Sequence, residues 1–157
     1  MRGSYGDTGV SVDRTQGQIR ALLQKHGIGG VHFGEDWGRH LIWFSFFKMK
    51  PLDNPGPEAD DPKQVPVTVK MQIPIWRDPA KWHRTSQALR EQRQRQVWRA
   101  LFHYLKSQLD AVEFGLRSFE DAFMSDIALQ DGKSVGDHVR SMLASDRLAL
   151  PTPAREE

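Results

Sequence analysis

Apolar residues alternate with other residues over residues 65–76, in the order Val-Pro-Val-Thr-Val-Lys-Met-Gln-Ile-Pro-Ile-Trp. A period of two places the two sets of side chains on opposite faces of a β-strand. Pro66 and Pro74 favour an edge position, because proline cannot donate a hydrogen bond to a neighbouring strand. The run at residues 41–47 is apolar on both faces, which is typical of a central strand. Together with the shorter run at 31–33, these segments predict a three-stranded antiparallel sheet.

A helix is predicted before the sheet. Thr15 and Gln18 have the spacing of a capping box, apolar residues follow at helical intervals, and Gly27 stands where a left-handed C-terminal residue is usual. Val10 and Val12 are expected to form a short extended entry to this helix.

A long helix is predicted after the sheet. Asp78 and Pro79 form a typical helix start, and no further Gly or Pro occurs before Gly115. A continuous helix over residues 79–114 would extend on the order of 54 Å, longer than a compact domain of this size. Part of it must therefore project, break or pack against another chain.

Two shorter helices are predicted near the end of the chain, over residues 119–127 and from the Ser134 cap to about residue 144. The fold class is therefore α+β: an N-terminal helix, a three-stranded antiparallel sheet and a long C-terminal basic helix plus short helices. We expect one domain over residues 10–145, with flexible tails at 1–9 and 146–157. Residues 51–64 contain four prolines and four acids and predict a mobile loop.

Composition excludes several classes of protein. The chain has 157 residues and no cysteine, which rules out a disulfide scaffold, a thiolate zinc site and a thiol nucleophile. The longest apolar run, at residues 41–47, is far shorter than a membrane span, and the first residues have no apolar signal core. We therefore expect a cytoplasmic protein without membrane association.

Charge is distributed unevenly along the chain. Residues 77–106 carry eight Lys and Arg against two Asp and Glu, whereas residues 107–157 carry five against ten. A clustered basic segment is typical of a surface that binds polyanions. On a helical wheel, a basic stripe borders the apolar arc, and it is formed by Lys81, Arg84, Arg95, Arg99 and Lys106. Arg90 and Arg93 point away from this stripe. Trp98 lies on the apolar arc and is expected in the core, whereas Trp82 lies off it as a candidate for base stacking. The predicted nucleic-acid-binding residues are Lys81, Trp82, Arg84, Arg90, Arg93, Arg95, Arg99 and Lys106.

Asp110 and Glu113 continue the basic stripe with the opposite charge, near a helix C-terminus where acids oppose the helix dipole. Local ion pairs of Lys106 with Asp110 and of Glu113 with Arg117 would account for them. A head-to-tail contact between the basic half of one copy and the acidic region of another is the alternative, and it implies a homo-oligomer.

Candidate catalytic groups are scattered. A metal site could use His32, Glu35, Asp36 and His40 around the predicted hairpin turn, but no fixed helical spacing brings them together. Magnesium nucleases gather carboxylates of the kind found at Asp110, Glu113, Glu120, Asp121 and Asp126. Surface acids are common on helices, so we expect no catalytic residue, no resident metal and no cofactor.

The order of the C-terminal segments resembles a group of proteins. The sequence QRQVWRAL at residues 94–101, KSQLDAVEFG at 106–115, FEDAF at 119–123 and LQDGKSVG at 129–136 is similar to small uncharacterised proteins encoded by bacteriophages and other mobile elements. The resemblance covers roughly residues 10–140. It implies no activity for any single residue, and it favours a role with nucleic acid.

We therefore expect a non-enzymatic nucleic-acid-binding accessory protein that contacts the phosphate backbone of DNA or RNA through its basic helix. A module that binds an acidic protein partner or another copy of the chain is the second hypothesis. A metal-dependent nuclease is the third.

Overall fold

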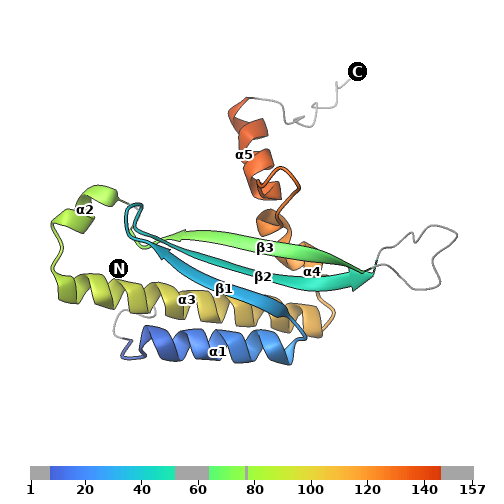
Figure 1. Ribbon diagram of the computed structural model, residues 1–157, viewed down its shortest axis with the longest axis horizontal. Helices are drawn as coiled ribbons and strands as arrows, with labels where there is room; N and C mark the ends of the chain where they lie inside the picture. Colours follow the sequence, from blue (N-terminus) through green and yellow to red (C-terminus); the bar gives the residue numbers. More distant parts are fainter. Residues whose placement is uncertain (1–7, 52–63, 77, 146–157) are drawn as a thin grey trace, which may run out of the picture.

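A computed structural model describes residues 8–51, 64–76 and 78–145 of the chain (Figure 1). The predicted tails and the predicted 51–64 loop lie mostly outside these residues. In chain order, the elements are α1 Val12–Lys25, β1 Gly29–Asp36, β2 Leu41–Pro51, β3 Gln64–Pro74, α2 Pro79–His83, α3 Gln87–Glu113, α4 Phe119–Phe123, a 3-10 turn Met124–Asp126 and α5 Val135–Ala144. This arrangement confirms the predicted α+β fold.

The sheet is antiparallel with the order β1-β2-β3, so β2 is central and β3 lies at an edge, as predicted. Phe44 in the middle of β2 pairs with Phe33 on one side and with Met71 on the other. Since cross-strand partners share a face, these three side chains point to the same side of the sheet.

Helices α1 and α3 cover that side of the sheet (Figure 1). The Phe33 ring stacks on Phe44 at a centroid distance of 5.3 Å and contacts the edge of Trp98 of α3 at 5.3 Å. Trp98 is fully buried, which confirms it as a core residue. Farther along β2, Phe46 meets Phe123 of α4 at 5.3 Å. The core of the domain therefore lies between the sheet and its three helical covers.

Helices α1 and α3 run parallel (Figure 1). Three contacts, at successive points along both helices, establish this direction. The Gln92 side chain donates to the carbonyl of Thr8 before α1, and Arg99 donates to Gln18 within α1. At the far end, His26 lies beside Asp110 and Glu113. Three antiparallel strands between two helices return the chain in its original direction, which brings both C-termini to one end of the domain.

The predicted start of α1 is wrong. The helix begins at Val12, and the N-cap is Ser11, whose hydroxyl accepts from the Arg14 amide at 3.2 Å. Val12 is therefore helical and not part of an extended entry. Thr15 is fully buried against the core instead of capping the helix. Both Ser and Thr can cap a helix, with Ser somewhat favoured, and here the Ser11 hydroxyl caps α1 while Thr15 is buried.

The predicted helix over residues 79–114 breaks between α2 and α3. The Thr85 hydroxyl donates to the Lys81 carbonyl, and the Ser86 hydroxyl accepts from the Leu89 amide as the N-cap of α3. These side-chain bonds compete with a continuous backbone ladder, which explains the break without Gly or Pro. As a consequence, Lys81 and Arg84 do not share a helix face with the basic residues of α3.

The C-terminal part begins with a shorter helix than predicted, because α4 ends at Phe123 and a 3-10 turn follows. Next, the Ala128 amide donates to the Thr68 carbonyl of β3 at 2.8 Å. The predicted cap of α5 is confirmed: Ser134 and Asp137 form a reciprocal capping box. This helix projects away from the sheet (Figure 1). Within the described residues, no helix has both the length and the apolar composition that a membrane crossing requires.

Candidate nucleic-acid interface

The predicted basic residues fall into two groups. Lys81 and Arg84 lie exposed in and just after α2, together with Trp82, whose side chain is outside the described part of the structure. The others lie on α3 and are Arg90, Arg93, Arg95, Arg99 and Lys106. The α2–α3 break shortens the helical stripe, which then spans about 17 Å from Arg95 to Lys106 at about 1.5 Å per residue.

Arg93 connects α3 to the end of the sheet. Its Nε donates to the carbonyl of Ile75 at 2.8 Å, just after β3, and its guanidinium lies 5.6 Å from the centroid of the Trp76 ring. These contacts attach the first turns of α3 to the end of the sheet. Arg90 is half-buried and also has an interaction partner. Both residues lie apart from the Arg95–Arg99–Lys106 row, as the helical wheel predicts.

Arg95, Arg99 and Lys106 lie on the side of α3 that borders α1. Arg99 hydrogen-bonds to Gln18 of α1, and its guanidinium lies 4.7 Å from the centroid of the Phe102 ring. Arg95 bonds to Gln92 on its own helix. Neutral glutamine partners orient these guanidinium groups without cancelling their charge, so both remain able to attract an anion.

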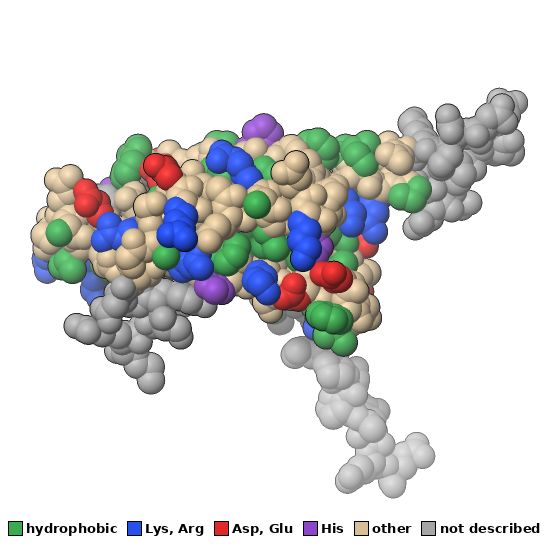
Figure 2. All heavy atoms as spheres, turned by 90° about the horizontal axis from the view of Figure 1, so that it is seen from below, with side chains coloured by type: hydrophobic (Ala, Val, Ile, Leu, Met, Phe, Trp, Pro, Cys, Tyr) green, Lys and Arg blue, Asp and Glu red, His purple; other side chains and the backbone are tan. Residues whose placement is uncertain are grey.

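Helix α1 adds two cations that sequence reasoning missed. Arg14 and Lys25 are exposed, and they lie within about 40° of Gln18 on the helical wheel. Because Gln18 contacts Arg99, this side of α1 faces the basic row of α3. A helical wheel of residues 12–25 would have identified the pair. Figure 2 shows the face that the helices form. Lys and Arg side chains are distributed over it, and they cover more of it than Asp and Glu side chains do. We call the set Arg14, Lys25, Arg95, Arg99 and Lys106 the cationic face.

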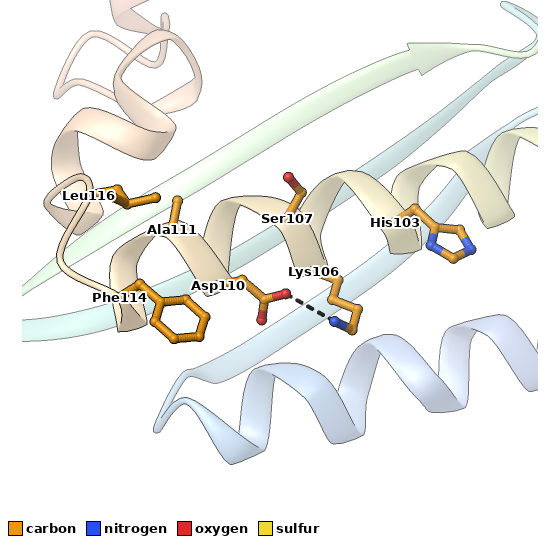
Figure 3. A pocket seen from close by; sticks show the side chains of 7 residues that line it. All are labelled: His103, Lys106, Ser107, Asp110, Ala111, Phe114 and Leu116. Carbon is orange, nitrogen blue, oxygen red and sulfur yellow. Dashed lines mark hydrogen bonds and ion pairs between the residues drawn. The ribbon is translucent and has the colours of Figure 1, made fainter.

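Two residues of the cationic face affect the pKa of the neighbouring His103. Burial lowers the pKa of its imidazole, and the positive charges of Arg99 and Lys106 lower it further. His103 also lines a hollow of about 420 Å³ on the C-terminal half of α3, together with Lys106, Asp110 and Phe114 (Figure 3). Arg99 and Lys106 thus lie close enough to His103 to disfavour the positive charge of its imidazolium.

The cationic face ends at acidic residues. Lys106 pairs with Asp110 at 2.9 Å, so this predicted local pair is confirmed (Figure 3). The second predicted pair does not form: Glu113 has no ion pair among the described residues, with Arg117 or with another cation.

The other acids proposed for a nuclease are not brought together. Glu120 pairs with Lys50 at 2.8 Å, and this partner lowers its pKa. Asp126 is half-buried, and burial raises its pKa. In the described part of the chain, the one group of three metal-ligating side chains is His26 with Asp110 and Glu113. Sequence reasoning missed His26, because 84 residues separate it from Asp110.

The candidate metal site at the hairpin turn does not form either. His32 and Glu35 are three residues apart on β1 and point to opposite faces of the sheet. Asp36 is paired with Arg39 at 2.8 Å, which lowers the pKa of the carboxyl. The His40 ring lies instead against the ring of His83, at a centroid distance of 6.0 Å.

Comparisons of the chain with models of protein families, with curated proteins and with solved structures give no match. The resemblance to small phage-encoded proteins therefore stays a prediction, and the functional argument rests on the residues described above.

Proposed function

We propose that this protein is a non-enzymatic nucleic-acid-binding accessory protein, of the kind that phages and mobile elements encode, and that it contacts the phosphate backbone through the cationic face. The observation that supports this most is the convergence of two parallel helices. Arg14 and Lys25 of α1 lie on the side that meets Arg99 of α3, and Arg95 and Lys106 extend the row in both directions.

The chemistry of these residues suits a phosphate backbone. Guanidinium groups bind phosphate oxygens through paired N–H donors, and a lysine ammonium contributes a point charge. Phosphate contacts carry no sequence information, so we expect binding that is strongly dependent on salt and weakly dependent on sequence.

The test is a titration of labelled single-stranded and double-stranded DNA and RNA of about 30 nucleotides at several salt concentrations, using protein freed of nucleic acid. Each phosphate contact on duplex DNA contributes about 0.9 to the slope of log affinity against log salt. We expect the double variant Arg95→Ala/Arg99→Ala to bind more weakly and to reduce the slope by up to about 1.8.

The matched control is the double variant Lys133→Ala/Arg140→Ala, which removes the same charge from exposed residues around the start of α5. It should leave both affinity and slope nearly unchanged. Equal losses in the two double variants would show that only net charge matters, and no binding by the native protein at low salt would refute the proposal. Circular dichroism verifies that each variant is folded.

A protein-docking role is the second candidate, and one observation favours it. Phe114 and Leu116 are 79% and 77% exposed at the end of α3, and both line the same hollow as His103 (Figure 3). Large apolar side chains with this exposure are typical of contact surfaces when they lie together.

If the chain self-associates there, sedimentation should give a mass that rises with concentration, and Phe114→Asp should abolish the rise. Leu143→Asp, at a residue 61% exposed on α5, is the control.

A further inference from the structure

At the point where α1 and α3 end together, the cationic face is followed by acidic residues. His26 is the C-cap of α1, and its backbone amide donates to the carbonyl of Leu23 at 3.1 Å. Asp110 and Glu113 lie one turn apart in the last part of α3. One imidazole nitrogen and one oxygen from each carboxylate all lie within 4.8 Å of one another. Two helices thus bring three metal-ligating groups to a single point.

The electrostatics of this point favour a cation. Because α1 and α3 are parallel, the negative ends of both helix dipoles meet here, where carboxylates are unfavourable. The last turn of α3 contains no basic residue. Lys106 neutralises part of the charge through Asp110, whereas Glu113 has no ion pair among the described residues. A bound dication would compensate for the remaining negative charge.

We propose that His26, Asp110 and Glu113 bind a first-row transition-metal dication, for which Zn²⁺ is the probe. An imidazole beside two carboxylates suits zinc, whereas Mg²⁺ and Ca²⁺ prefer oxygen ligands alone. In a tetrahedral site, zinc bonds of about 2.0–2.2 Å place neighbouring ligand atoms roughly 3.3–3.6 Å apart, so the three side chains need only rotate inward.

Lys106 supports the same assignment as an outer partner. Its Nζ donates to Oδ2 of Asp110 at 2.9 Å, which leaves Oδ1 available to the metal (Figure 3). Carboxylates that ligate metals are usually oriented by a hydrogen bond of this kind. This inference does not depend on nucleic-acid binding, and it assigns no reaction to the site.

The experiment is calorimetric titration of Zn²⁺ into the full-length protein, freed of metal and nucleic acid, in a buffer that does not chelate. We expect one zinc ion per chain. Loss of a ligand should lower the affinity by about tenfold or more in His26→Ala, in Asp110→Asn and in Glu113→Gln. The last two substitutions keep the shape of the side chain, so an unfolded His26 variant would not remove the test.

Two control variants define the site by contrast. His138→Ala removes an exposed imidazole that pairs with Asp131 at 2.7 Å, and His83→Ala removes the imidazole beside His40. Both should bind zinc like the native protein. The proposal is refuted if the native protein binds no zinc, or if zinc binding depends on His138 or His83 and not on His26. Paramagnetic broadening by Mn²⁺ gives a second readout, because amide signals of residues 25–27 and 109–114 should weaken first.

Discussion

The two faces of the sheet use aromatic side chains in different ways. On the face covered by helices, Phe44 and Phe46 are fully buried between the layers. On the outer face, Trp43 is 39% exposed, and its ring lies over the backbone of Gly34, where an added Cβ would lie 1.9 Å from Cε2 of the ring. Phe47 lies over Gly30 in the same manner.

Aromatic side chains on the covered face form the core, whereas those on the outer face cover the backbone of β1. The covered face gains stability by removing large apolar side chains from water. On the outer face, Trp43 stays partly exposed to solvent. Because Gly34 has no side chain, the Trp43 ring can lie directly against the backbone of β1.

The largest effect is expected for substitutions at neighbouring residues of β2. Phe44→Ala should lower the free energy of unfolding by about 3–5 kcal/mol, because it leaves a cavity in the packed core. Trp43→Ala should cost about 1 kcal/mol, because the ring is only partly buried. Urea denaturation of the two variants measures the difference, and equal losses would show that the outer face is as tightly packed as the core.

Gly34→Ala tests the ring that lies on the outer face. The new methyl group occupies the position of the Trp43 indole, so the ring must move, at a cost of about 1–3 kcal/mol. In the double variant Gly34→Ala/Trp43→Ala the clash is absent, and the two effects should not add. A change in Trp43 fluorescence should accompany the single substitution. Additive effects in the double variant would contradict the contact.

Gly17→Ala is the matched glycine substitution on the helical side. Gly17 is exposed in the middle of α1, and an added Cβ would meet nothing within 4 Å. Alanine should therefore raise the free energy of unfolding by about 0.5–1 kcal/mol, through its higher helix propensity. Denaturation midpoints give the sign directly, and opposite signs at residues 17 and 34 would sharpen the contrast between the two faces.

The smallest effect concerns charge on the helical side. Burial and the cations Arg99 and Lys106 lower the pKa of His103. A phosphate bound to these cations should raise that pKa towards its ordinary value, because a nearby anion favours the imidazolium. NMR titration with and without an oligonucleotide measures the shift, and high salt should remove it. A change in pKa confined to His32 would show that the oligonucleotide binds the outer face of the sheet instead.

Much of the fold could be predicted because it is determined by local patterns. Period-two alternation identifies β3, apolar residues on both faces identify the central β2, and Ser134 with Asp137 identifies the start of α5. The start of α1 is not predicted correctly, because both Ser11 and Thr15 can cap a helix and the burial of Thr15 depends on contacts that are distant in the sequence.

The candidate site could be predicted only as a set of basic residues. Sequence periodicity places Arg95, Arg99 and Lys106 on one side of a helix, but it does not identify their neighbours on α1. Arg93 resembles the other arginines in sequence, yet it binds the Ile75 carbonyl. The approach of His26 to Asp110 requires two helices to be placed side by side, which depends on the whole sheet between them.

The pairing of α1 with α3 also has a consequence during synthesis of the chain. Gln18 and Arg99, which join the two helices, are separated by 81 residues. At about 5–20 residues per second, the ribosome needs roughly 4–16 s to produce the partner of α1 after α1 itself. Throughout that interval Ile19 and Leu23 lack the layer that buries them in the finished domain. Helix α1 is therefore made well before α3 can cover it, and in that interval it is a target for a chaperone that binds short apolar segments.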